Sequence, residues 1–586
     1  MATYEELKQG AERRWKELNS RPWIRVGTAM CGQAAGALEV VATLKAKLAA
    51  RKIDAVVSEV GCLGLCYAEP IVDVAKPGKA RLLLGNVTPA DVDAIVDGYL
   101  ASNRVPPQKA LGYLAAAGQA PLAGVPDFKA LSGYGKQNRV ALRNGGHIDP
   151  TDIFQYIATG GYAGLNKALS AMKPADVIKE VTDSGLRGRG GAAFPTGVKW
   201  SFLVRSNAPR KYILCNCEEG DPGAFNDKTI LESDPHTLLE GITIGGYATG
   251  STNGYVFIRH GHDGPINRTE AAIQQAYKAG LLGKNILGTN FSFDIEVALT
   301  GESYVAGEET ALMEAIEGHR SMPRARPPFP AAYGVWGRPS NINNVKTLAY
   351  APEIISKGAA WFSSIGVNKS KGTAIVCLTG HVQRPGIYEV AMGLTLGEVI
   401  NDIGGGVSGG KQLKLLQTGG PLGGVLSAAS TTVTIDFDEM AKAGAILGSG
   451  GIIVADSDTC AVDLTRNLVA FCQFESCGKC FPCRIGTTNL LEIVDRIVTC
   501  QTRPGDLELM RSIGKTIQAG SLCGHGQLGF NPIRSALQHF AADFDAHMKT
   551  GKCATGGCEK PRLSPTNTRP FAQEATPEAA LTGRPA

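Results

Sequence analysis

The sequence predicts a multidomain α/β protein. The chain has 586 residues, and at roughly 100–200 residues per domain this length suggests three to five domains. Short apolar strands alternate with amphipathic helices over much of the chain, whereas the last quarter is helical and rich in cysteine. The 73 glycines cluster in short loops without a repeat, which excludes collagen-like and low-complexity proteins.

Charge and hydropathy exclude further classes. Lys+Arg 59 against Asp+Glu 54 gives a net charge of +5, too weak over this length to support nucleic-acid binding. No run of 18 or more apolar residues is present, and the polar N-terminus lacks the apolar core of a secretory signal. We therefore expect a cytoplasmic protein without membrane insertion, whose 15 cysteines are more often metal ligands or catalytic groups than disulfides.

The residue pattern changes along the chain and divides it into seven segments. The order of strands, helix and glycine turn after residue 372 suggests a β-grasp domain, and the Pro-, Thr- and Ala-rich tail suggests disorder. The expected segments are an N-terminal helix (1–22), a small α/β domain (23–100), a linker (101–137), a glycine-punctuated α/β domain (138–340), the β-grasp domain (341–455), a helical domain (456–548) and the tail (549–586).

A cysteine cluster near the C-terminus is the strongest single motif. Cys477, Cys480 and Cys483 form C-x2-C-x2-C, and Cys523 follows 40 residues after the triplet. Three thiolates at this spacing can face one site, and the fourth completes the ligand set of a [4Fe–4S] cluster. Zinc also accepts four thiolates, but usually from two C-x2–4-C pairs, so zinc and a metal-free cluster remain the alternatives.

A glycine-rich segment at residues 184–200 suggests a phosphate-binding loop. Glycines let the backbone approach a ligand closely, and Arg187, Arg189 and Lys199 supply positive charge. The spacing fits neither the dinucleotide fingerprint nor the Walker A motif. A glycine-rich turn with solvated arginines is the alternative interpretation.

Acidic segments follow this loop. Residues 213–227 place carboxylates after an apolar strand, and residues 301–318 repeat the pattern with Glu308 and Glu309. Residues 324–330 and 341–347 add further polar motifs. Carboxylates beside a phosphate loop suit ribose hydroxyls and a nicotinamide amide rather than phosphate.

Together these ordered motifs resemble the NADH-oxidising flavoprotein subunit of respiratory complex I. They are equally similar to its relatives in soluble NAD-linked hydrogenases, formate dehydrogenases and electron-bifurcating reductases. The resemblance covers residues 138–547, roughly 70% of the chain. It implies a Rossmann-like domain for FMN and NADH, a β-grasp domain of the soluble-ligand-binding type, and a helical bundle holding one [4Fe–4S] cluster.

The resemblance also assigns site residues. We expect Tyr304, Glu308 and Glu309 to border the flavin and the nicotinamide and to act in catalysis. The residues expected at FMN are Gly185, Arg187, Gly188, Gly190, Gly191, Lys199, Asn216, Glu218, Glu219, Gly307, Asn343, Asn344 and Thr347. The residues expected at NADH are Phe194, Phe202 and Phe329 around the adenine, with Asp221, Glu309 and Arg326 nearby.

Several positions depart from the family pattern. Glu218 stands where the family usually has Asp, and Asp221 stands for a Glu. Arg326 stands for a Lys, and because arginine binds phosphate more directionally, the choice between NADH and NADPH stays open. Ala306 replaces a common Cys, and Lys346 replaces a Glu.

The N-terminal domain resembles a thioredoxin-like [2Fe–2S] ferredoxin. Cys62 and Cys66 match the family's second pair, C-x3-C. The first pair is usually C-x4-C, but only Cys31 is present, and Gly27 is expected at the position of the missing ligand. Three interpretations remain: a docking domain without a cluster, a cluster completed by a non-cysteine or partner ligand, or a redox-active Cys62–Cys66 disulfide.

The other cysteines carry weaker expectations. Cys553 and Cys558 form a C-x4-C pair in the predicted tail, which we interpret as a remnant of a ferredoxin-like extension or as inert. The following are expected to pack as small apolar residues, with Cys217 the one beside the flavin segment: Cys215, Cys217, Cys377, Cys460, Cys472 and Cys500.

The resemblance implies a diaphorase subunit. A hydride passes between nicotinamide C4 and flavin N5, and electrons then pass singly to the [4Fe–4S] cluster and on to a partner subunit, in either direction. The fused N-terminal domain favours a soluble multisubunit complex. The alternatives are the NADH-oxidising subunit of membrane complex I and a non-catalytic docking or assembly protein. An oligomer is expected, and the partner's substrate (formate, hydrogen, ferredoxin or acyl-CoA) stays open.

Overall fold

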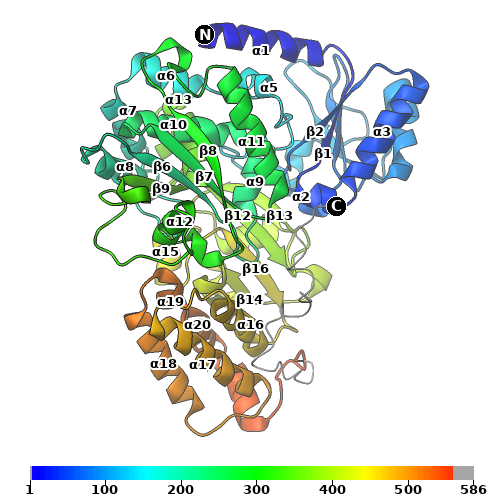
Figure 1. Cartoon of the computed structure of the whole chain (residues 1–586). Coiled ribbons are helices and arrows are strands. Elements are labelled where there is room, and N and C mark those ends of the chain that lie inside the picture. The colour runs from blue at the N-terminus through cyan, green and yellow to red at the C-terminus, as the bar shows by residue number, and fades with distance from the viewer. Residues whose placement is uncertain (1–2, 559–586) are drawn as a thin grey trace, which may run out of the picture.

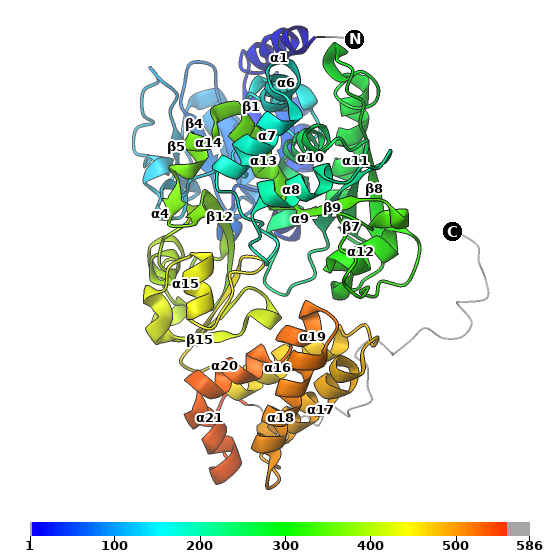
Figure 2. The same ribbon diagram turned by 90° about the vertical axis from the view of Figure 1, so that its left-hand side faces the viewer.

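The computed structural model describes residues 3–558, which form four packed regions (Figure 1). A small domain in blue lies beside a parallel α/β domain in green, and a second sheet in yellow-green connects these to a helical bundle in orange. Figure 2 shows that the bundle lies below the edge of both sheets. Tail residues 559–586, for which we predict disorder, lie outside the described residues.

Helix α1 (Tyr4–Leu18) packs mainly against α5 (Ile153–Ala158) of the α/β domain, and its Trp15 also contacts the Trp23 ring of the domain that follows, with 5.4 Å between ring centroids. Its buried residues Leu7 and Ala11 belong to the α/β core, and the Tyr4 hydroxyl donates to Gly161 O at 3.2 Å. The helix begins with a capping box between Thr3 and Glu6, which satisfies two backbone donors at its N-terminus. The predicted N-terminal helix therefore joins two domains.

The N-terminal domain is a five-stranded sheet in the order β2-β1-β3-β4-β5, with β1 and β2 parallel. Helix α3 (Ala37–Arg51) covers one face and buries Val40 and Leu44 in the domain core. The strands are β1 (Trp23–Gly27), β2 (Val56–Val60), β3 (Val72–Ala75), β4 (Arg81–Leu84) and β5 (Ala110–Leu114). Because β5 pairs with β4, the segment at 101–137 that was predicted to be a linker completes this sheet.

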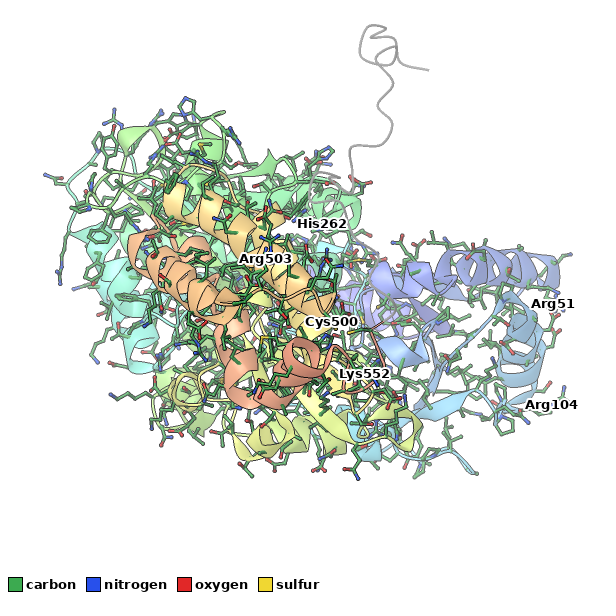
Figure 3. All side chains as sticks on the ribbon, turned by 90° about the horizontal axis from the view of Figure 1, so that it is seen from below. Arg51, Arg104, His262, Cys500, Arg503 and Lys552 are labelled. Carbon is green, nitrogen blue, oxygen red and sulfur yellow. The ribbon has the colours of Figure 1, made fainter. Side chains whose placement is uncertain are left out.

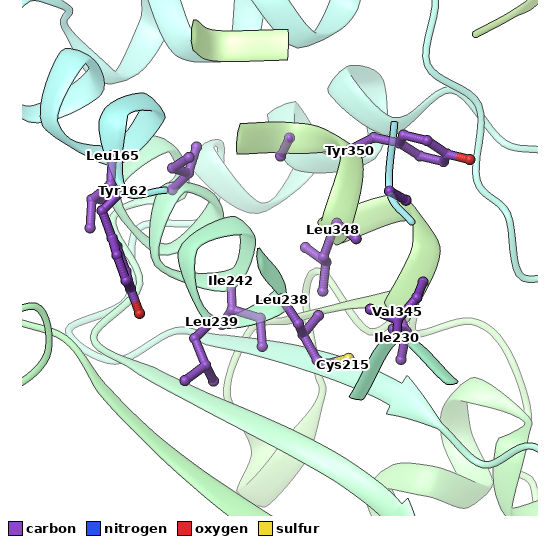
Figure 4. Packing of buried hydrophobic residues seen from close by; sticks show 14 of the residues in the cluster. Tyr162, Leu165, Cys215, Ile230, Leu238, Leu239, Ile242, Val345, Leu348 and Tyr350 are labelled. Carbon is purple, nitrogen blue, oxygen red and sulfur yellow. The ribbon is translucent and has the colours of Figure 1, made fainter. Parts of the chain in front are cut away.

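The central α/β domain contains four parallel strands in the order β8-β7-β6-β9. Their bounds are β6 (Tyr212–Cys217), β7 (Asn253–Arg259), β8 (Asp294–Thr300) and β9 (Ser340–Asn344). Helices α10 (Pro235–Thr249) and α13 (Val345–Lys357) pack on one face, where Leu238, Ile242 and Leu348 interdigitate (Figure 4). Residues 340–357 thus belong to this domain, so the expected β-grasp boundary at 341 lies too early.

One glycine explains how closely these two helices approach. A Cβ added at Gly241 of α10 would lie 2.1 Å from Leu348 O of α13, closer than real Cβ contacts allow. Glycine at this position therefore permits the helix–helix contact that covers the sheet.

Further helices surround the sheet. Their bounds are α5 (Ile153–Ala158), α6 (Ala163–Ala171), α7 (Pro174–Asp183), α8 (Thr196–Val204), α9 (Asn226–Ser233), α11 (Asp263–Lys278) and α12 (Glu309–Ile316).

The third region is a five-stranded mixed sheet in the order β13-β12-β16-β14-β15, as the β-grasp prediction requires. Helix α15 (Phe437–Lys442) buries Phe437 and Met440 against its core. The strands are β12 (Thr373–Gly380), β13 (Gly386–Ala391), β14 (Leu413–Thr418), β15 (Val425–Ser427) and β16 (Gly451–Asp456).

The C-terminal region is a helical bundle around a separate core that contains Leu490, Val494 and Ile517. Its helices are α16 (Ala461–Phe474), α17 (Phe481–Val498), α18 (Asp506–Gly520), α19 (Gly524–Leu528), α20 (Asn531–His539), α21 (Ala541–Asp545) and the short η12 (Ala546–Thr550). Across residues 3–558, no helix is both long enough and apolar enough to cross a bilayer.

A buried carboxylate joins the α/β domain to the second sheet. Glu389 of β13 is fully buried and accepts hydrogen bonds from the backbone N–H groups of Val140 (2.8 Å), Ala141 (3.1 Å) and Leu142 (2.9 Å). The Tyr350 hydroxyl of α13 donates to the same carboxylate at 3.2 Å. Because these donors come from another domain, Glu389 fixes how the two domains pack.

Replacement of Glu389 tests this role. We expect Glu389→Ala to lower the free energy of unfolding by about 3 kcal/mol or more, because three buried backbone donors lose their acceptor. Thermal and urea unfolding of the variant measure the loss. The exposed Glu12→Ala is the control, expected to stay within about 0.5 kcal/mol of the parent. A Glu389→Ala variant as stable as this control would contradict the role.

Candidate functional site

A single cleft of about 430 Å³ gathers most of the predicted site. It lies at the carboxyl ends of β6 and β9, the edge at which parallel sheets usually bind ligands. The bundle closes one side with Gly524 and His525, and the second sheet contributes Gly419 and Ser449. The predicted residues in its lining are Gly190, Gly191, Asn216, Glu218, Glu219, Asp221, Tyr304, Gly307, Glu308, Arg326 and Asn344.

The glycine-rich loop is held by a hydrogen bond within the loop, and two of its glycines line the cleft. Gly188 N donates to Phe194 O at 2.8 Å, so residues 188–194 form a tight turn. Gly191 has φ +112°, a conformation that favours glycine, and a Cβ there would meet only Gly448 Cα, at 3.9 Å. This leaves an open backbone surface facing the cleft. Gly185 also has positive φ, +70°, and turns the chain into the loop.

The basic residues of this loop already have partners. Arg189 is buried and donates to the carbonyls of Lys371 (2.6 Å) and Thr373 (3.2 Å), so its guanidinium fastens the loop to the second sheet. Arg187 pairs with Asp438 at 3.2 Å and stays partly exposed. Lys199 donates to Ile342 O at 2.6 Å, and burial lowers its pKa.

The acidic residues after β6 are buried and differ in role. Glu218 pairs with Arg259 at 3.0 Å, yet burial raises the pKa of Glu218 to about 8. Glu219 accepts from the backbone N–H groups of Asp227 and Lys228 and so caps α9, and burial raises its pKa to about 7. At neutral pH the cleft therefore carries less negative charge than its composition suggests.

Asp221 faces the cleft with an unsatisfied atom. Its Oδ1 has no hydrogen-bond partner among the described residues, and burial raises the pKa of this carboxyl to about 6. A Cβ at Gly420 would lie 2.5 Å from Oδ1, so glycine is needed where the second sheet approaches. A buried acceptor without a partner suits a bound ligand.

A buried ion pair that the motifs did not single out forms part of the cleft wall. Lys346 Nζ lies 2.9 Å from Asp227 Oδ1, and Asn344 donates to the same carboxylate. Lys346 also contacts Asn226 and Ser449 O. From sequence, Lys346 was only a departure from the family pattern.

The other predicted residues around the cleft serve as supports. Asn216 bridges Gly307 O (2.8 Å) and the backbone N–H of Glu218 (3.0 Å), which ties two cleft segments together. Asn343 lies behind the cleft, where Trp200 Nε1 donates to its amide oxygen at 3.3 Å. Thr347 Oγ1 accepts from Arg189 N at 2.9 Å and holds the glycine loop.

Four of the predicted NADH residues lie outside the cleft lining, and we call them the rim: Phe194, Phe202, Glu309 and Phe329. Asp221 and Arg326 belong to the lining. Phe194 and Phe202 are about 45% and 40% exposed, and their ring centroids lie 6.1 Å apart. Glu309 pairs with Lys199 at 3.5 Å and with Arg326 at 2.6 Å. Phe329 is more exposed still, at 61%. Exposed aromatic rings beside a charged network can bind a planar base and its phosphates.

Glu308 has a local structural role. Its carboxylate accepts from Thr310 N and Ala311 N as the N-cap of α12. Because it also lines the cleft, the cap orients this carboxylate toward the ligand space.

The four cysteines of the predicted [4Fe–4S] site come from two adjacent helix starts. Cys480 is the N-cap of α17, with Cys477 before it and Cys483 in its first turn, and Cys523 is the N-cap of α19. No three of their Sγ atoms come within 4.8 Å of one another. These four thiols therefore do not form the compact group that a single ion needs, whereas each thiolate of a [4Fe–4S] cluster binds a different iron.

The cluster site adjoins the cleft directly. Gly524 and His525, which line the cleft, follow Cys523 in the chain. His525 Nε2 contacts Cys472 O at 2.8 Å, and Nδ1 is buried without a partner among residues 3–558. The Tyr304 ring lies 5.8 Å from His525 between centroids. The cleft and the four-cysteine group are therefore joined through residues 523–525.

The three cysteines of the N-terminal domain converge. The Sγ atoms of Cys31, Cys62 and Cys66 all lie within 4.8 Å of one another, and Cys31 and Cys62 are 3.4 Å apart. A C-x4-C spacing counted back from Cys31 reaches Val26, not Gly27, and Val26 packs into the core of its own domain. Gly27 is therefore the wrong position for that spacing, although it faces this site.

The loop that carries Cys62 is held between domains. Cys62 N donates to Ser233 Oγ at 3.1 Å on α9, and Ile387 N of β13 donates to Gly64 O at 2.8 Å. These contacts agree with a docking role for the domain.

The expectation for three other cysteines was wrong. Cys460 does not simply pack in the core, and Cys553 and Cys558 are not isolated in a tail. Together with His547 they form a four-ligand group whose ligand atoms all lie within 4.8 Å of one another. The missing ligands were not visible from sequence because they come from segments about 90 residues apart.

Three segments of the chain match known protein families. Residues 181–353 match the "Nuo51 FMN-binding domain", residues 375–426 the "SLBB domain", and residues 463–547 the "NADH-ubiquinone oxidoreductase-F iron-sulfur binding region". The chain is 48% identical over 423 residues to the HndC subunit of the NADP-reducing hydrogenase of Solidesulfovibrio fructosivorans, covering 72% of this chain and 86% of that protein.

One further relative and one solved structure are also similar to this chain. The F subunit of NADH-quinone oxidoreductase from Escherichia coli (strain K12) is 37% identical, over 68% of this chain and 90% of its own length. The solved structure of an NAD+-reducing [NiFe]-hydrogenase in the H2-reduced state matches with TM-score 0.63 and 27% identity, over 90% of this chain and 84% of the matched one.

The fold and the paired flavin and cluster sites define an NADH-dependent flavin and iron–sulfur oxidoreductase of the multisubunit type. More particularly, the chain belongs to the family of NADH-binding FMN and [4Fe–4S] subunits of complex I-type enzymes and NAD-linked hydrogenases. Its resemblance to that family, seen first in the motifs, is confirmed.

The pKa of Asp221 generates a prediction. The pKa of Asp221 is about 6 in the folded chain and about 4, the ordinary value, in the unfolded chain. As pH rises, the unfolded chain therefore releases this proton first. The free energy of unfolding falls between these two pH values. Asp221→Asn should remove the penalty. In the FMN-free protein we expect the variant to gain on the order of 2 kcal/mol over the parent at pH 7.5 and nearly nothing at pH 4.

Unfolding midpoints across this pH range measure the effect. Asp402→Asn, on an exposed surface, is the control and should show no pH-dependent gain. An Asp221→Asn variant whose stability runs parallel to the parent at all pH values would contradict the raised pKa.

Proposed function

We propose that the cleft binds FMN and the nicotinamide end of NADH, and that Cys477, Cys480, Cys483 and Cys523 hold the cluster that takes the electrons onward. The observation that carries this is the shared wall of the two sites. Gly524 and His525 line the cleft, and their neighbour Cys523 is a cluster ligand. Bound FMN would exchange a hydride with NAD(H) and pass electrons singly to the cluster.

The residues present fit FMN. The open backbone at Gly191 offers a close approach for the phosphate and ribityl chain, beside the ammonium of Lys346. Asn344 lies on the same wall, and the partnerless Oδ1 of Asp221 can accept from a ligand N–H or hydroxyl. Partial protonation of Glu218 and Glu219 limits repulsion of an anionic cofactor.

The rim supports NADH binding outside the flavin. Phe194 and Phe202 present two exposed faces for the adenine. Glu309, held by Lys199 and Arg326, offers a fixed carboxylate to ribose hydroxyls, and Arg326 remains close enough to meet a phosphate. Phe329 follows Arg326 by three residues and supplies a third aromatic group.

We further propose a soluble, cytoplasmic, multisubunit redox complex as the setting. The relative with 48% identity is named as a hydrogenase subunit, and the matched structure is an NAD+-reducing hydrogenase. All 15 cysteines are free, which suits a reducing compartment. The partner receives or supplies electrons at the bundle. Membrane complex I is the second candidate, because other relatives are named as the F subunit of NADH-quinone oxidoreductase.

One preparation tests the proposal. The anaerobically purified chain should contain one FMN and about four irons with acid-labile sulfide, and NADH should bleach the flavin absorbance. A colourless preparation that binds no FMN after reconstitution would instead favour the non-catalytic docking alternative. Retention on membranes through a high-salt wash would favour complex I.

Replacing a cluster ligand separates the two cofactors. Cys480→Ser should lose about four irons per chain, while FMN content and part of the NADH–ferricyanide activity remain, since that dye can take electrons from the flavin. Iron analysis and dye reduction give both readings. The buried Cys377→Ala, outside the cluster group, is the control and should keep its iron. Unchanged iron in Cys480→Ser would contradict the ligand assignment.

Replacing Glu309 tests the rim. Glu309→Gln weakens the pairs with Lys199 and Arg326 and removes the carboxylate expected at the ribose. We expect KM for NADH to rise about tenfold with FMN content unchanged. Glu314 lies on the same helix as Glu309 and pairs with Arg324, so Glu314→Gln is the matched control. Equal KM values for the two variants would argue against an NADH site here.

A further inference from the structure

Four metal-binding side chains converge at the end of the bundle farthest from the cleft. Cys460 is the N-cap of α16, His547 lies in η12, and Cys553 and Cys558 follow it. Cys460 and His547 are buried. The labels for Cys500 and Lys552 mark this end of the bundle in Figure 3.

The spacing of these ligand atoms fits one ion. His547 Nε2 lies 3.4 Å from Cys460 Sγ and 3.8 Å from Cys558 Sγ, and all four ligand atoms lie within 4.8 Å of one another. A tetrahedral zinc with bonds of about 2.0–2.3 Å separates its ligands by about 3.5–3.8 Å. A [4Fe–4S] cluster holds its ligand sulfurs farther apart than this, because each thiolate binds a different iron, and the other four cysteines do not form such a compact group.

The other ring nitrogen of His547 has its own partner. Nδ1 lies 3.7 Å from Cys500 Sγ, and Cys500 is not part of the four-ligand group. A ligating histidine usually has its second nitrogen fixed in this way, which orients the ring. The roles of Nε2 as ligand and Nδ1 as the outer contact therefore follow from the geometry.

We propose that Cys460, His547, Cys553 and Cys558 bind a structural zinc ion. Three thiolates and one imidazole are an established zinc ligand set, and four protein ligands leave no open position for substrate. The ion would hold residues 546–558 against the start of α16. Residues 549–558, which were predicted to belong to a disordered tail, would thus be ordered by metal binding. The site is separate from the flavin-to-cluster route.

Metal analysis of the full-length chain tests this proposal. The double variant Cys553→Ser/Cys558→Ser should contain one zinc per chain less than the parent. Its FMN and iron contents should equal those of the parent. Cys377→Ala, which removes a buried thiol far from this group in the chain, is the control and should keep the zinc. Cobalt added to the zinc-free parent should give thiolate charge-transfer and tetrahedral absorption bands, and the double variant should lose the part of these bands that belongs to one cobalt per chain.

Other results would overturn it. Equal zinc in the parent and the double variant would exclude these ligands. A loss of about four irons with sulfide in the double variant, while Cys477 and its partners are intact, would mean a second cluster instead of zinc. Retained FMN in the variant shows that it has folded, so that a failure of folding is not mistaken for support.

A different observation concerns the N-terminal cysteines. A Cβ added at Gly27 would lie 3.0 Å from Oε2 and 3.1 Å from Oε1 of Glu69. The Glu69 carboxylate thus fills the space that a side chain at position 27 would take. Its Oε1 is 4.0 Å from Cys31 Sγ, beside Cys62 and Cys66.

Glu69 is buried without a cation to balance it. It is 6% exposed, and no salt bridge to it is found in residues 3–558; its protein donors are Ile71 N at 2.8 Å and the Cys31 thiol. Buried carboxylates are usually paired or bound to a metal. The compact group itself contains only the three thiols, and Glu69 approaches it at Cys31, with 4.0 Å between Oε1 and Sγ. From this we infer that Glu69 moves in as the fourth ligand of a single zinc-like ion held by Cys31, Cys62 and Cys66, because three sulfurs within 4.8 Å are too close for a two-iron cluster.

This site can be tested in the Cys553→Ser/Cys558→Ser background, in which the first zinc is absent. We expect one remaining zinc, lost in Cys62→Ser and in Glu69→Ala. Adding Gly27→Cys to Glu69→Ala should restore it, since the alanine frees the space that a cysteine side chain needs at position 27. Glu59→Ala, on an exposed edge, is the control.

Three outcomes would overturn the inference. Metal content that does not depend on Glu69 would remove it as a ligand. Two irons with two sulfides at this site would mean a cluster rather than one ion. Alkylation and mass spectrometry that show a disulfide among Cys31, Cys62 and Cys66 in the freshly isolated chain would mean that the thiols are not metal ligands.

Discussion

One buried ammonium group joins the two domains that face each other across the cleft. Lys346 of α13 reaches Asp227 Oδ1 at 2.9 Å in its own domain and Ser449 O at 3.3 Å in the second sheet, and Asn226 is its third acceptor. A buried charge is tolerated only when its donors are satisfied, so the acceptors must stay in place. The same contacts position the cleft wall, the loop after β6 and the approach of the second sheet. The cleft thus depends on how the domains pack.

Packing also sets the electron route. The proposed flavin site lies at the carboxyl edge of the parallel sheet, and the proposed cluster site lies at the N-termini of two helices in the bundle. His525 lines the cleft and follows the proposed cluster ligand Cys523 by two residues. Had the bundle been attached only through a flexible linker, this proximity would be lost. Glu389 and Lys346 fix the two sheets to each other, and the bundle in turn packs on β15 through α20.

Sulfur spacing separates two kinds of cysteine site among the described residues of this chain. Cys477, Cys480, Cys483 and Cys523, which we propose to hold a four-iron cluster, do not form a compact group. The group at Cys460 and the group at Cys31 are compact, as one ion requires. Because both arrangements occur in the same structure, the difference follows from local fold rather than from cysteine content.

The sequence predicted the multidomain α/β fold, and about half of the residues predicted for the flavin and NADH sites meet in the cleft, because each depends on local motifs, while the cluster ligands stay a prediction. The glycine loop, the acidic residues after β6 and the C-x2-C-x2-C triplet all lie within short segments. What could not be predicted depends on long-range contacts. The pairing of β5 with β4, the partner of Lys346 and the meeting of Cys460 with Cys558 join segments that no spacing rule connects. Arg189 was taken for a phosphate ligand, but only the structure shows its carbonyl partners.

The most direct test is to follow the electrons within the isolated chain. Rapid mixing with NADH, read by flavin absorbance and by freeze-quench EPR of the cluster, compares the two centres in time. If the cleft and the cluster share a wall as described, the cluster signal should follow flavin reduction within milliseconds and without any partner subunit. A flavin that NADH reduces fully while a dithionite-reducible cluster stays oxidised would contradict the central claim.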